Sequence, residues 1–496
     1  MFEDAAAPDY AVGTADAALP AISRRKNVNG VGTTLAAAAV GSRRSGAVIE
    51  PWDLRTRSYS SPHSAAPTRD PEAHVEQCLD AIATHDGQLH AFVAVDPEGA
   101  RAAAAASAAR WRDGRPLSPI DGMPVGVKDI IDVAGWPTRM HSVLRADAPP
   151  ARFDAACVAA LRRAGAVVIG KTATTEFACG RSTDTVNPFD PTRTPGGSSS
   201  GAGAAVGRGL IPASLATQTR ASTIRPAAFC GAYGFKPSFG ALNLGGVHPV
   251  AASFDHLGLI AASLEECWSV ARVIAAQVGG GPGERPLAGP LTAPPAMPPA
   301  RLAMVETPGL GESDAATRAL FTAVAERLRT LGFEVVDRRT DVRVEALEQA
   351  MDGCDLLARE LIGFEMRWPY WMYRDHDATA LGDPIHRYLA LADHFTAADV
   401  TLRTARRAAF TAAFATLDAD VDMFVTLAAG PAPGGLAETG TRLFITPWTM
   451  AGLPSVSLPL FVLDGMPVGL QLAGWRHADA RLIAHARALE AAIRTA

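Results

Sequence analysis

Residues 123–131, Met123-Pro124-Val125-Gly126-Val127-Lys128-Asp129-Ile130-Ile131, decide the fold class of this chain. Their apolar, β-branched first half predicts a short buried strand, which leads at Lys128 and Asp129 into a polar loop. Further along, residues 155–164 have helical spacing, and Ala166-Val167-Val168-Ile169 predicts a second buried strand. Strands that alternate with helices are typical of an α/β fold with a mixed central β-sheet flanked by α-helices.

The same alternation extends outward in both directions. Before residue 123 the pattern predicts a helix from Pro71 to about Gly87, a strand at 91–95 and a long helix at 97–112. Residues 279–299 form a Gly/Pro-rich connector. Beyond it the predicted elements are strands at 301–305 and 333–336, a helix at 313–331, a mainly helical stretch at 345–418, strands at 421–427, 455–460 and 469–472, and a closing helix.

Composition and charge exclude several classes of protein. The 496 residues contain 46 basic and 51 acidic side chains, a formal net charge of −5, so a strongly basic nucleic-acid binder is excluded and no nucleic-acid partner is expected. Hydrophobic residues make up 48% and charged residues 20%, which indicates a folded globular chain. No apolar run reaches the roughly 18 residues of a membrane span, so none is predicted.

Lysine is scarce in this chain. Only Lys26, Lys128, Lys171 and Lys236 occur, against 42 arginines. A buried amine can lose its proton whereas a guanidinium cannot, so a lysine retained in an arginine-rich chain is a candidate for chemistry. Three of the four lie between residues 128 and 236, which makes that segment the first place to look for a site.

The six cysteines predict neither disulfides nor a metal site. They are scattered, with no CxxC pair and no histidines at zinc-finger spacing. We expect free, buried thiols and no metal.

Residues 1–70 are rich in Ala, Ser and Pro and predict a flexible N-terminal extension. Ser23-Arg24-Arg25-Lys26 precedes a weakly apolar stretch and resembles a twin-arginine export signal, although Asn27 and Asn29 depart from that pattern. We therefore expect a cytoplasmic protein, with export to the periplasm as the alternative.

Two segments match the residue patterns of known motifs, but the structure predicted for each segment does not fit the motif. Gly165 to Thr172 fits a phosphate-binding P-loop, yet its apolar, β-branched interior predicts a strand instead of a flexible turn. Gly197 to Gly201 fits G-x-S-x-G, the nucleophile elbow of α/β-hydrolases, with Ser199 at its apex and His248 or His256 as candidate bases. The proline-rich residues 187–196 before it cannot form the central strand that an elbow requires.

A third arrangement joins several ordered segments, in which Ser198 and Ser222 lie 24 positions apart. Together these segments resemble the amidase signature family, and the resemblance covers about residues 70–490. It implies a catalytic domain at 71–496 with the amidase-signature α/β fold and with no cofactor. The segments are Lys128 after its strand, Gly196-Gly197-Ser198-Ser199-Ser200-Gly201, Thr217 to Gly231, Gly234 to Gly240, Ser253-Phe254-Asp255, Pro447-Trp448-Thr449 and Gly452-Leu453-Pro454.

The resemblance also implies a role for each of these polar residues. Ser222 attacks the amide carbonyl, Ser198 relays the proton through a cis peptide bond in the Gly-Ser-Ser segment, and Lys128 accepts it. The loop before the nucleophile, Thr219-Arg220-Ala221, supplies oxyanion and substrate contacts together with Ser199. Arg225, Lys171 and Lys236 are expected to support the fold.

The chain departs from the family just before the nucleophile. Family members commonly carry Gly-Gly or Ala-Gly there, whereas this chain has Arg220-Ala221. If either position needs a positive φ, its Cβ strains the loop, and a displaced amide would remove about 3 kcal/mol of transition-state stabilisation. Our alternative hypothesis is that Arg220 pairs with an acidic group of the substrate, as opposed to pointing out to solvent.

The expected activity is hydrolysis of a carbon–nitrogen amide bond in a small molecule. Carbamate or ester cleavage, and the ammonia-producing component of a glutamine amidotransferase, are alternatives within the same chemistry. A catalytically weakened binding protein is an alternative of another class, and a homodimer stays open. The aromatic cluster Trp368, Tyr370, Trp371 and Tyr373 predicts either core packing or a substrate pocket.

Overall fold

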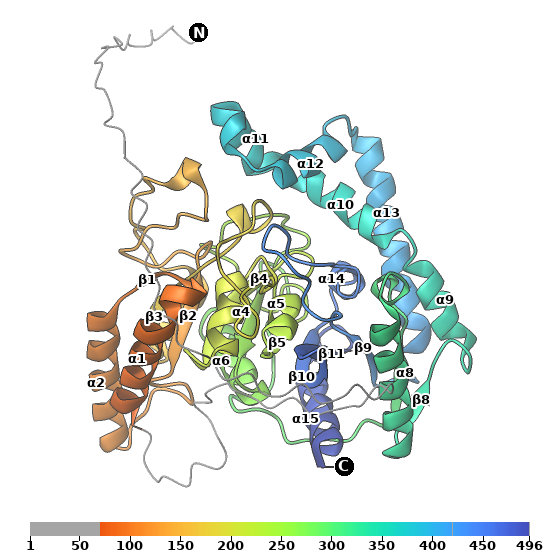
Figure 1. The fold of residues 1–496 in the computed structure, drawn as a ribbon, viewed down its shortest axis with the longest axis horizontal. Helices are drawn as coiled ribbons and strands as arrows, with labels where there is room; N and C mark the ends of the chain where they lie inside the picture. The colour runs from red at the N-terminus through yellow and green to blue at the C-terminus, as the bar shows by residue number, and fades with distance from the viewer. Residues whose placement is uncertain (1–69, 419, 496) are drawn as a thin grey trace, which may run out of the picture. The chain divides into compact units, whose positions relative to one another are not determined.

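A mixed sheet of eleven strands runs through the part of the chain that this computed structural model describes, residues 70–418 and 420–495 (Figure 1). Its strand order is β1-β3-β2-β4-β6-β5-β10-β11-β9-β7-β8, which confirms the predicted α/β fold with a mixed central sheet. The strands are β1 (Phe92–Val95), β2 (Pro124–Lys128), β3 (Val167–Thr172), β4 (Ala213–Gln218), β5 (Tyr233–Lys236), β6 (His256–Ala261), β7 (Arg301–Met304), β8 (Glu334–Val336), β9 (Met423–Leu427), β10 (Ser455–Leu463) and β11 (Met466–Ala473).

Helices flank this sheet. The α-helices are α1 (Pro71–Leu89), α2 (Pro97–Arg112), α3 (Ala156–Arg163), α4 (Ser200–Gly207), α5 (Ile224–Phe229), α6 (Leu264–Val278), α7 (Pro308–Gly311), α8 (Ala315–Thr330), α9 (Val342–Ala350), α10 (Cys354–Glu365), α11 (Arg367–Asp377), α12 (Asp383–Ala392), α13 (Ala397–Phe414), α14 (Thr446–Met450) and α15 (Asp479–Thr495). Short 3₁₀ helices are η1 (Val143–Arg145), η2 (Glu176–Ala178), η3 (Ala378–Ala380) and η4 (Ala415–Leu417). The predicted extension and its twin-arginine-like stretch lie outside the described residues, apart from Asp70.

Local sequence explains where the first two helices begin. Asp70 and Asp96 each accept a hydrogen bond from a main-chain N–H three residues on, and each is followed by a proline at the first helical position. The aspartate side chain accepts from a first-turn N–H group that has no partner within the helix. Proline suits the first helical position because it has no N–H group to leave unpaired. Both helices are therefore specified by short-range signals.

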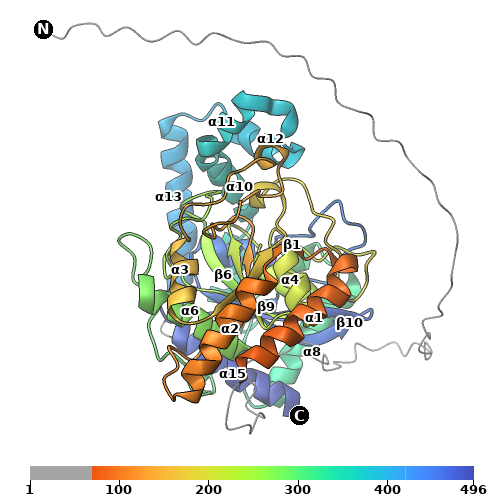
Figure 2. The same cartoon turned by 90° about the vertical axis from the view of Figure 1, so that its left-hand side faces the viewer.

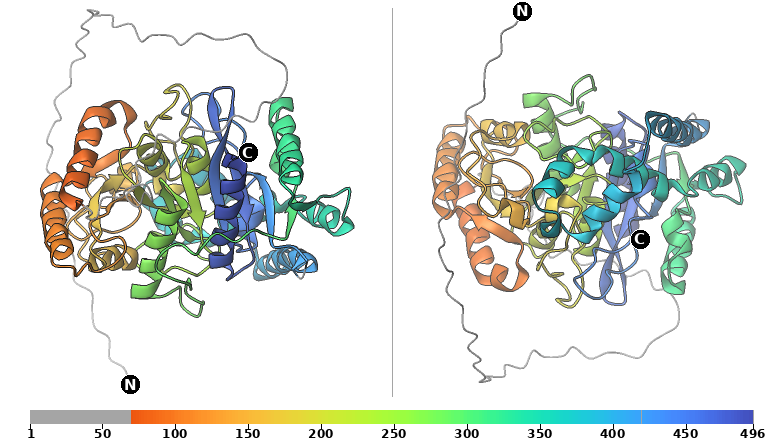
Figure 3. Two further views of the ribbon diagram at one scale, coloured as in Figure 1. Left: turned by 90° about the horizontal axis from the view of Figure 1, so that it is seen from below. Right: turned by 90° about the horizontal axis from the view of Figure 1, so that it is seen from above.

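Alternating side chains place a core on each face of the sheet. In β3, Val167 and Ile169 pack with helices α1, α2 and α4, while Val168 joins the core that contains residues of α3, α6 and α15. This follows from the two-residue period of a strand. Figure 2 shows α1 and α2 side by side in front of the sheet, and the left view of Figure 3 shows the α15 side.

The strand register brings several chain segments to one edge of the sheet. β2 runs parallel to both β3 and β4, so that Lys128 lies opposite Thr172 and Val127 lies opposite Leu215. β6 runs antiparallel to β4 and begins at His256, opposite Gln218. The carboxyl ends of β2, β3 and β4 and the start of β6 therefore meet, at the kind of edge where open α/β sheets bind ligands.

Helices α10 to α13 gather beyond this part of the sheet, as Figure 1 and the right view of Figure 3 both show. Their predicted helical character is confirmed. The connector at 279–299 joins α6 to β7. The chain before it and the chain after it both contribute strands to the same sheet, so the connector does not separate two sheets.

Two further predictions are confirmed. Residues 167–172 form strand β3 and no helix begins at Lys171, so the segment that matches the P-loop pattern is a strand. All six cysteines are free; five are buried as predicted, whereas Cys179 is partly exposed.

Helix α4 packs its backbone against neighbouring backbone. Its sequence is SGAGAAVG, and all eight residues are buried. A Cβ built on Gly207 would lie 2.0 Å from the Cys230 carbonyl oxygen, and one on Gly201 would lie 2.1 Å from the Ala91 carbonyl oxygen. Side chains larger than hydrogen are therefore excluded at Gly201 and Gly207.

We predict that Gly207→Ala destabilises the protein by about 1–3 kcal/mol, because the new methyl group meets backbone that cannot move aside. Gly87→Ala is the matched control. That glycine lies in helix α1 with nothing within 4 Å of its added Cβ, so alanine should stabilise by about 0.5–1 kcal/mol. Thermal and denaturant unfolding of both variants measure the effect. Equal shifts would contradict the close packing of α4.

Candidate active site

A buried lysine and a serine form the centre of the site. Lys128 is the last residue of β2 and is fully buried. Its Nζ donates to Ser198 Oγ at 2.7 Å and to Thr217 Oγ1, on β4, at 2.8 Å. Burial lowers the pKa of Lys128 to about 7, although the carboxylate of Asp255 acts in the opposite direction. An amine with such a pKa is available as a base near neutral pH.

Ser198 lies in a main-chain segment that other groups hold in place. The Gly197–Ser198 peptide bond is cis. The Arg225 guanidinium, which is buried, donates to the Gly197 carbonyl oxygen, to Thr439 Oγ1 at 2.9 Å and to the Gly440 carbonyl oxygen at 2.6 Å. The expected supporting role of Arg225 therefore has a concrete form, since it ties the Ser198 segment to the loop at 439–440.

Ser222 lines the same small cavity as Ser198. It is partly exposed, and its hydroxyl makes no hydrogen bond to other described residues. The loop that carries it is anchored by Gln218, whose Oε1 accepts from the N–H groups of Thr223 at 2.9 Å and Ile224 at 3.0 Å. Thr449 completes the anchor, because its Oγ1 accepts from Gln218 Nε2 at 2.9 Å and donates to the Arg220 carbonyl oxygen at 2.7 Å.

The main-chain amides before Ser222 are free. Within the described residues, none of the N–H groups of Arg220, Ala221 and Ser222 donates a hydrogen bond. Neither Arg220 nor Ala221 has a positive φ, so their Cβ atoms add no strain of that kind to the loop. The condition under which the Arg220-Ala221 pair would strain the backbone is therefore not met.

Asp255 connects the loop to the lysine. It precedes β6, and its carboxylate accepts from Thr219 Oγ1 at 2.5 Å and from the N–H groups of Val250 at 2.8 Å and Ala251 at 3.0 Å. Burial raises the pKa of Asp255 to about 6. Thr219 thus contributes its side chain to a buried carboxylate and also lines the cavity.

Arg220 is not an outward-pointing surface residue. Its guanidinium is buried and donates to the carboxylate of Asp355 on α10 and to Tyr388 Oη on α12 at 2.9 Å. Burial lowers the pKa of Arg220. Because Asp355 already neutralises this arginine, the hypothesis that Arg220 itself pairs with an acidic substrate group loses its support.

Ser199 does not join the other candidates at the cavity. It is fully buried, and its Oγ lies 3.4 Å from both the N and the O of Thr217. The histidines of the elbow interpretation are held elsewhere, since His248 contacts Tyr373 Oη at 3.0 Å and His256 contacts the Phe254 carbonyl oxygen at 2.6 Å. The structure therefore offers Ser199 no base.

The aromatic cluster does not line the site cavity either. Tyr370 is buried and packs, with Tyr373, against Phe177, whereas Trp368 is 67% exposed. The aromatic side chain that does line the cavity is Tyr388, which sequence patterns did not single out.

The other two lysines of the 128–236 segment are also buried, but they have structural partners. Lys171 Nζ pairs with Asp129 at 2.8 Å and donates to Thr138 Oγ1 at 3.1 Å. Lys236 Nζ donates to the carbonyl oxygens of Pro237 and Leu453, and burial lowers its pKa to about 7.

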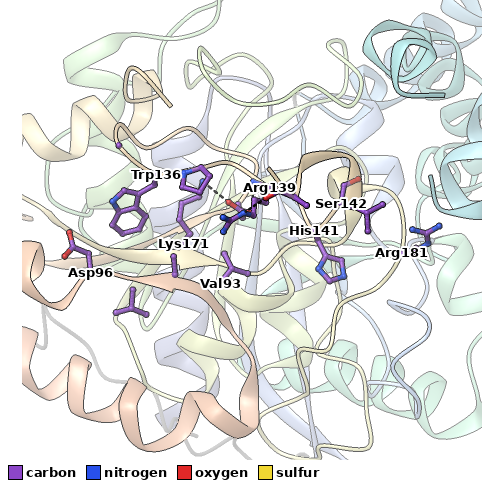
Figure 4. A pocket seen from close by; sticks show the side chains of 15 residues that line it. Val93, Asp96, Trp136, Arg139, His141, Ser142, Lys171 and Arg181 are labelled. Carbon is purple, nitrogen blue, oxygen red and sulfur yellow. Dashed lines mark hydrogen bonds and ion pairs between the residues drawn. The ribbon is translucent and has the colours of Figure 1, made fainter. Parts of the chain in front are cut away.

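A second, larger cavity of about 930 Å³ lies over the Lys171–Asp129 pair (Figure 4). Val93, Trp136, Arg139 and His141 are among its lining residues. It shares no lining residue with the cavity at Ser198 and Ser222, and its lining serine, Ser142, makes no hydrogen bond to the buried Lys171. We therefore place the candidate site at the smaller cavity.

Sequence reasoning missed the residues that position the candidates. Thr217, Gln218 and Thr449 lay within quoted segments but were given no role, and Asp355 and Tyr388 carried no signal at all. Their contacts join positions far apart in the chain, as in the Gln218–Thr449 pair, separated by 231 residues. The described residues contain no helix of the length and hydropathy that a membrane crossing requires.

Comparisons with a family model and with known proteins both indicate the amidase family. The family model described as Amidase matches residues 73–483. The chain is 35% identical over 465 residues to the A subunit of glutamyl-tRNA(Gln) amidotransferase from Anaeromyxobacter sp. (strain K), covering 84% of this chain and 92% of that protein. It is 42% identical over 196 residues to the AtzE subunit of 1-carboxybiuret hydrolase from Pseudomonas sp. (strain ADP), covering 38% of this chain and 43% of that protein.

Solved structures agree with this family. The native peptide amidase from Stenotrophomonas maltophilia superimposes with a TM-score of 0.66 at 26% identity, covering 86% of this chain and 94% of that one. The amidase signature resemblance is therefore confirmed over most of the sequence. This chain belongs to the amidase family, whose enzymes hydrolyse carbon–nitrogen bonds.

Proposed function

We propose that the protein hydrolyses an amide through an acyl-enzyme on Ser222, with Ser198 and Lys128 carrying the proton. The observation that carries the proposal is the 2.7 Å contact between Lys128 Nζ and Ser198 Oγ, at a lysine whose burial lowers its pKa to about 7. A serine hydroxyl needs an adjacent base to act as a nucleophile, and a neutral lysine can serve.

The proposed reaction has two balanced halves. Ser222 Oγ attacks the amide carbonyl as its proton passes to Ser198 Oγ and the Ser198 proton passes to Lys128 Nζ. Collapse of the tetrahedral intermediate breaks the carbon–nitrogen bond, and the relay returns a proton to the leaving amine. Water then attacks the acyl-enzyme by the same route, which frees the acid and restores Ser222.

The free amides of the Ser222 loop support stabilisation of the oxyanion. The N–H groups of Arg220, Ala221 and Ser222 have no acceptor within the described residues. Donors fixed before the reaction stabilise the developing negative charge without reorganising. Gln218 and Thr449 fix this loop from its two sides, so an intact catalytic loop is favoured over a weakened binding protein. Ester or carbamate cleavage would use the same groups.

A fluorophosphonate should add one covalent label at Ser222. We predict that Lys128→Ala and Ser198→Ala each slow labelling about 100-fold or more, the usual size of a general-base contribution. Ser199→Ala is the matched control, since that hydroxyl faces Thr217, and it should label at nearly the wild-type rate. Intact mass and peptide mapping measure all four proteins. A label on Ser199 would contradict the assignment.

The hydrolysis rate should rise with pH through about 7. Only neutral Lys128 accepts a proton, and its neutral fraction grows tenfold per pH unit below its pKa and levels off above it. Asp255 raises the pKa of Lys128, so Asp255→Asn should move the rising limb to lower pH. Lys128→Arg should be inactive at every pH tested, because guanidinium stays charged. The pH profile of kcat/KM for an uncharged amide measures this; a flat profile from pH 5 to 9 would exclude Lys128 as the base.

A second candidate function is ammonia production from glutamine for a transferase complex. It is favoured by the 35% identity to a protein named as the A subunit of glutamyl-tRNA(Gln) amidotransferase. In that case the purified protein should release ammonia from glutamine, and Ser222→Ala should not. Ammonia release from simple amides with none from glutamine would leave the amidase proposal alone.

A further inference from the structure

The cavity at Ser198 and Ser222 opens into a larger one. The inner part has a volume of only about 40 Å³, while the outer part measures about 610 Å³. The two share six lining residues: Cys179, Gly180, Arg220, Tyr388, Thr439 and Arg442. The inner part is less than a tenth as large as the outer part, so it has room for little beyond the reacting group. The remainder of a substrate must therefore lie in the outer cavity.

The walls of the two cavities carry an excess of positive charge. Five arginines line them (Arg220, Arg225, Arg359, Arg387 and Arg442), against three acidic residues (Glu312, Asp355 and Glu438). The whole chain has the opposite balance, with a formal net charge of −5. A local field that opposes the sign of the molecule attracts and concentrates anions at the site.

Two of these arginines already have structural partners. Arg220 pairs with Asp355, and Arg225 donates to main-chain carbonyl oxygens and to Thr439. The other three have no ion pair among residues 70–418 and 420–495. Arg442 has one long contact, from its Nη2 to Thr439 Oγ1 at 3.4 Å.

Arg442 occupies the junction between the inner and the outer cavity. It is partly exposed, so its guanidinium is accessible to a ligand. Burial lowers the pKa of Arg225, and the positive charges of Arg442 and Arg220 lower it further. The guanidinium groups of Arg442 and Arg225 repel each other, and an anion placed beside Arg442 would stabilise both.

We propose that the substrate is an amide that also carries a carboxylate, and that Arg442 binds this carboxylate. The inference rests on the proposed function and names its substrate class. A guanidinium matches a carboxylate with two parallel hydrogen bonds, which fixes the orientation of the substrate as well as its charge. Arg359 and Arg387, on the outer wall, draw the anion in. The acidic residues of the same wall disfavour a doubly charged group such as a phosphate.

The test compares charged and uncharged substrates of one shape. The monoamides of malonate, succinate and glutarate each have a diamide in which a neutral amide replaces the carboxylate. Ammonia release gives kcat/KM for each pair. For at least one chain length the wild-type protein should prefer the monoamide by about 10- to 100-fold, the range expected for a charge-assisted hydrogen-bonded pair.

Substitutions then assign the preference to one residue. Arg442→Gln should remove the preference, mainly through a higher KM for the monoamide, and should lower kcat/KM for the monoamide far more than for the diamide. Arg442→Lys keeps the charge without the paired hydrogen bonds and should retain part of the preference. Arg112→Gln, at an exposed position on α2, makes the same charge change away from the cavity and should change nothing.

Equal rates for every monoamide and its diamide would overturn the inference, as would an Arg442→Gln variant that loses both activities equally. The proposed hydrolysis is judged separately, by labelling of Ser222. If no amide is hydrolysed, calorimetric titration of Ser222→Ala decides between the outcomes. If Ser222→Ala releases heat with the monoamide but not with the diamide, and the double variant Ser222→Ala/Arg442→Gln releases none, carboxylate binding is supported. If Ser222→Ala gives the same heat with both compounds, the inference is overturned.

Discussion

The burial of one amine is the constraint on which the site depends. Lys128 Nζ lies inside the protein at the end of β2, where its charged form is penalised by the loss of water. Neutral or charged, it needs hydrogen-bond partners there, and Ser198 and Thr217 provide them from two other segments. The parallel alignment of β2 with β4 places Thr217 within reach, so the sheet register and the chemistry of the lysine are linked.

The loop that carries Ser222 is also held by residues distant in the sequence. Gln218 and Thr449 fix it by hydrogen bonds across 231 residues, and Asp255 fixes it through Thr219. Among the described residues, these contacts leave the loop amides without a protein acceptor, as the proposed oxyanion site requires. The arginine at position 220 is accommodated because its side chain extends away to Asp355 and Tyr388. The main chain keeps an ordinary φ there, so the bulky residue and an open loop coexist.

Volume divides the cavity into two parts. The inner part holds the serines and has little free volume, whereas the outer part is larger and is lined by both arginines and acidic residues. Helices α10 and α12 supply much of this outer wall, through Asp355, Arg359, Arg387 and Tyr388. The proposed reacting groups lie in the motifs that resemble the family, whereas these outer-wall residues of α10 and α12 lie outside those motifs. Substrate selection is therefore expected to depend on residues outside the family's motifs.

The sequence alone determined the α/β class and most helices and strands outside residues 200–278, and its resemblance to the amidase signature family implied the proposed roles of Lys128, Ser198 and Ser222. Local periodicity and ordered motifs carry that information, because each is written within a few neighbouring residues. Pattern analysis assigned no strand to β4, β5 or β6, which are only four to six residues long. Tertiary structure alone decided that Asp355 neutralises Arg220, that Gln218 meets Thr449, and that Arg442 stands at the cavity junction. Such contacts depend on how distant segments pack, and no local pattern encodes that packing.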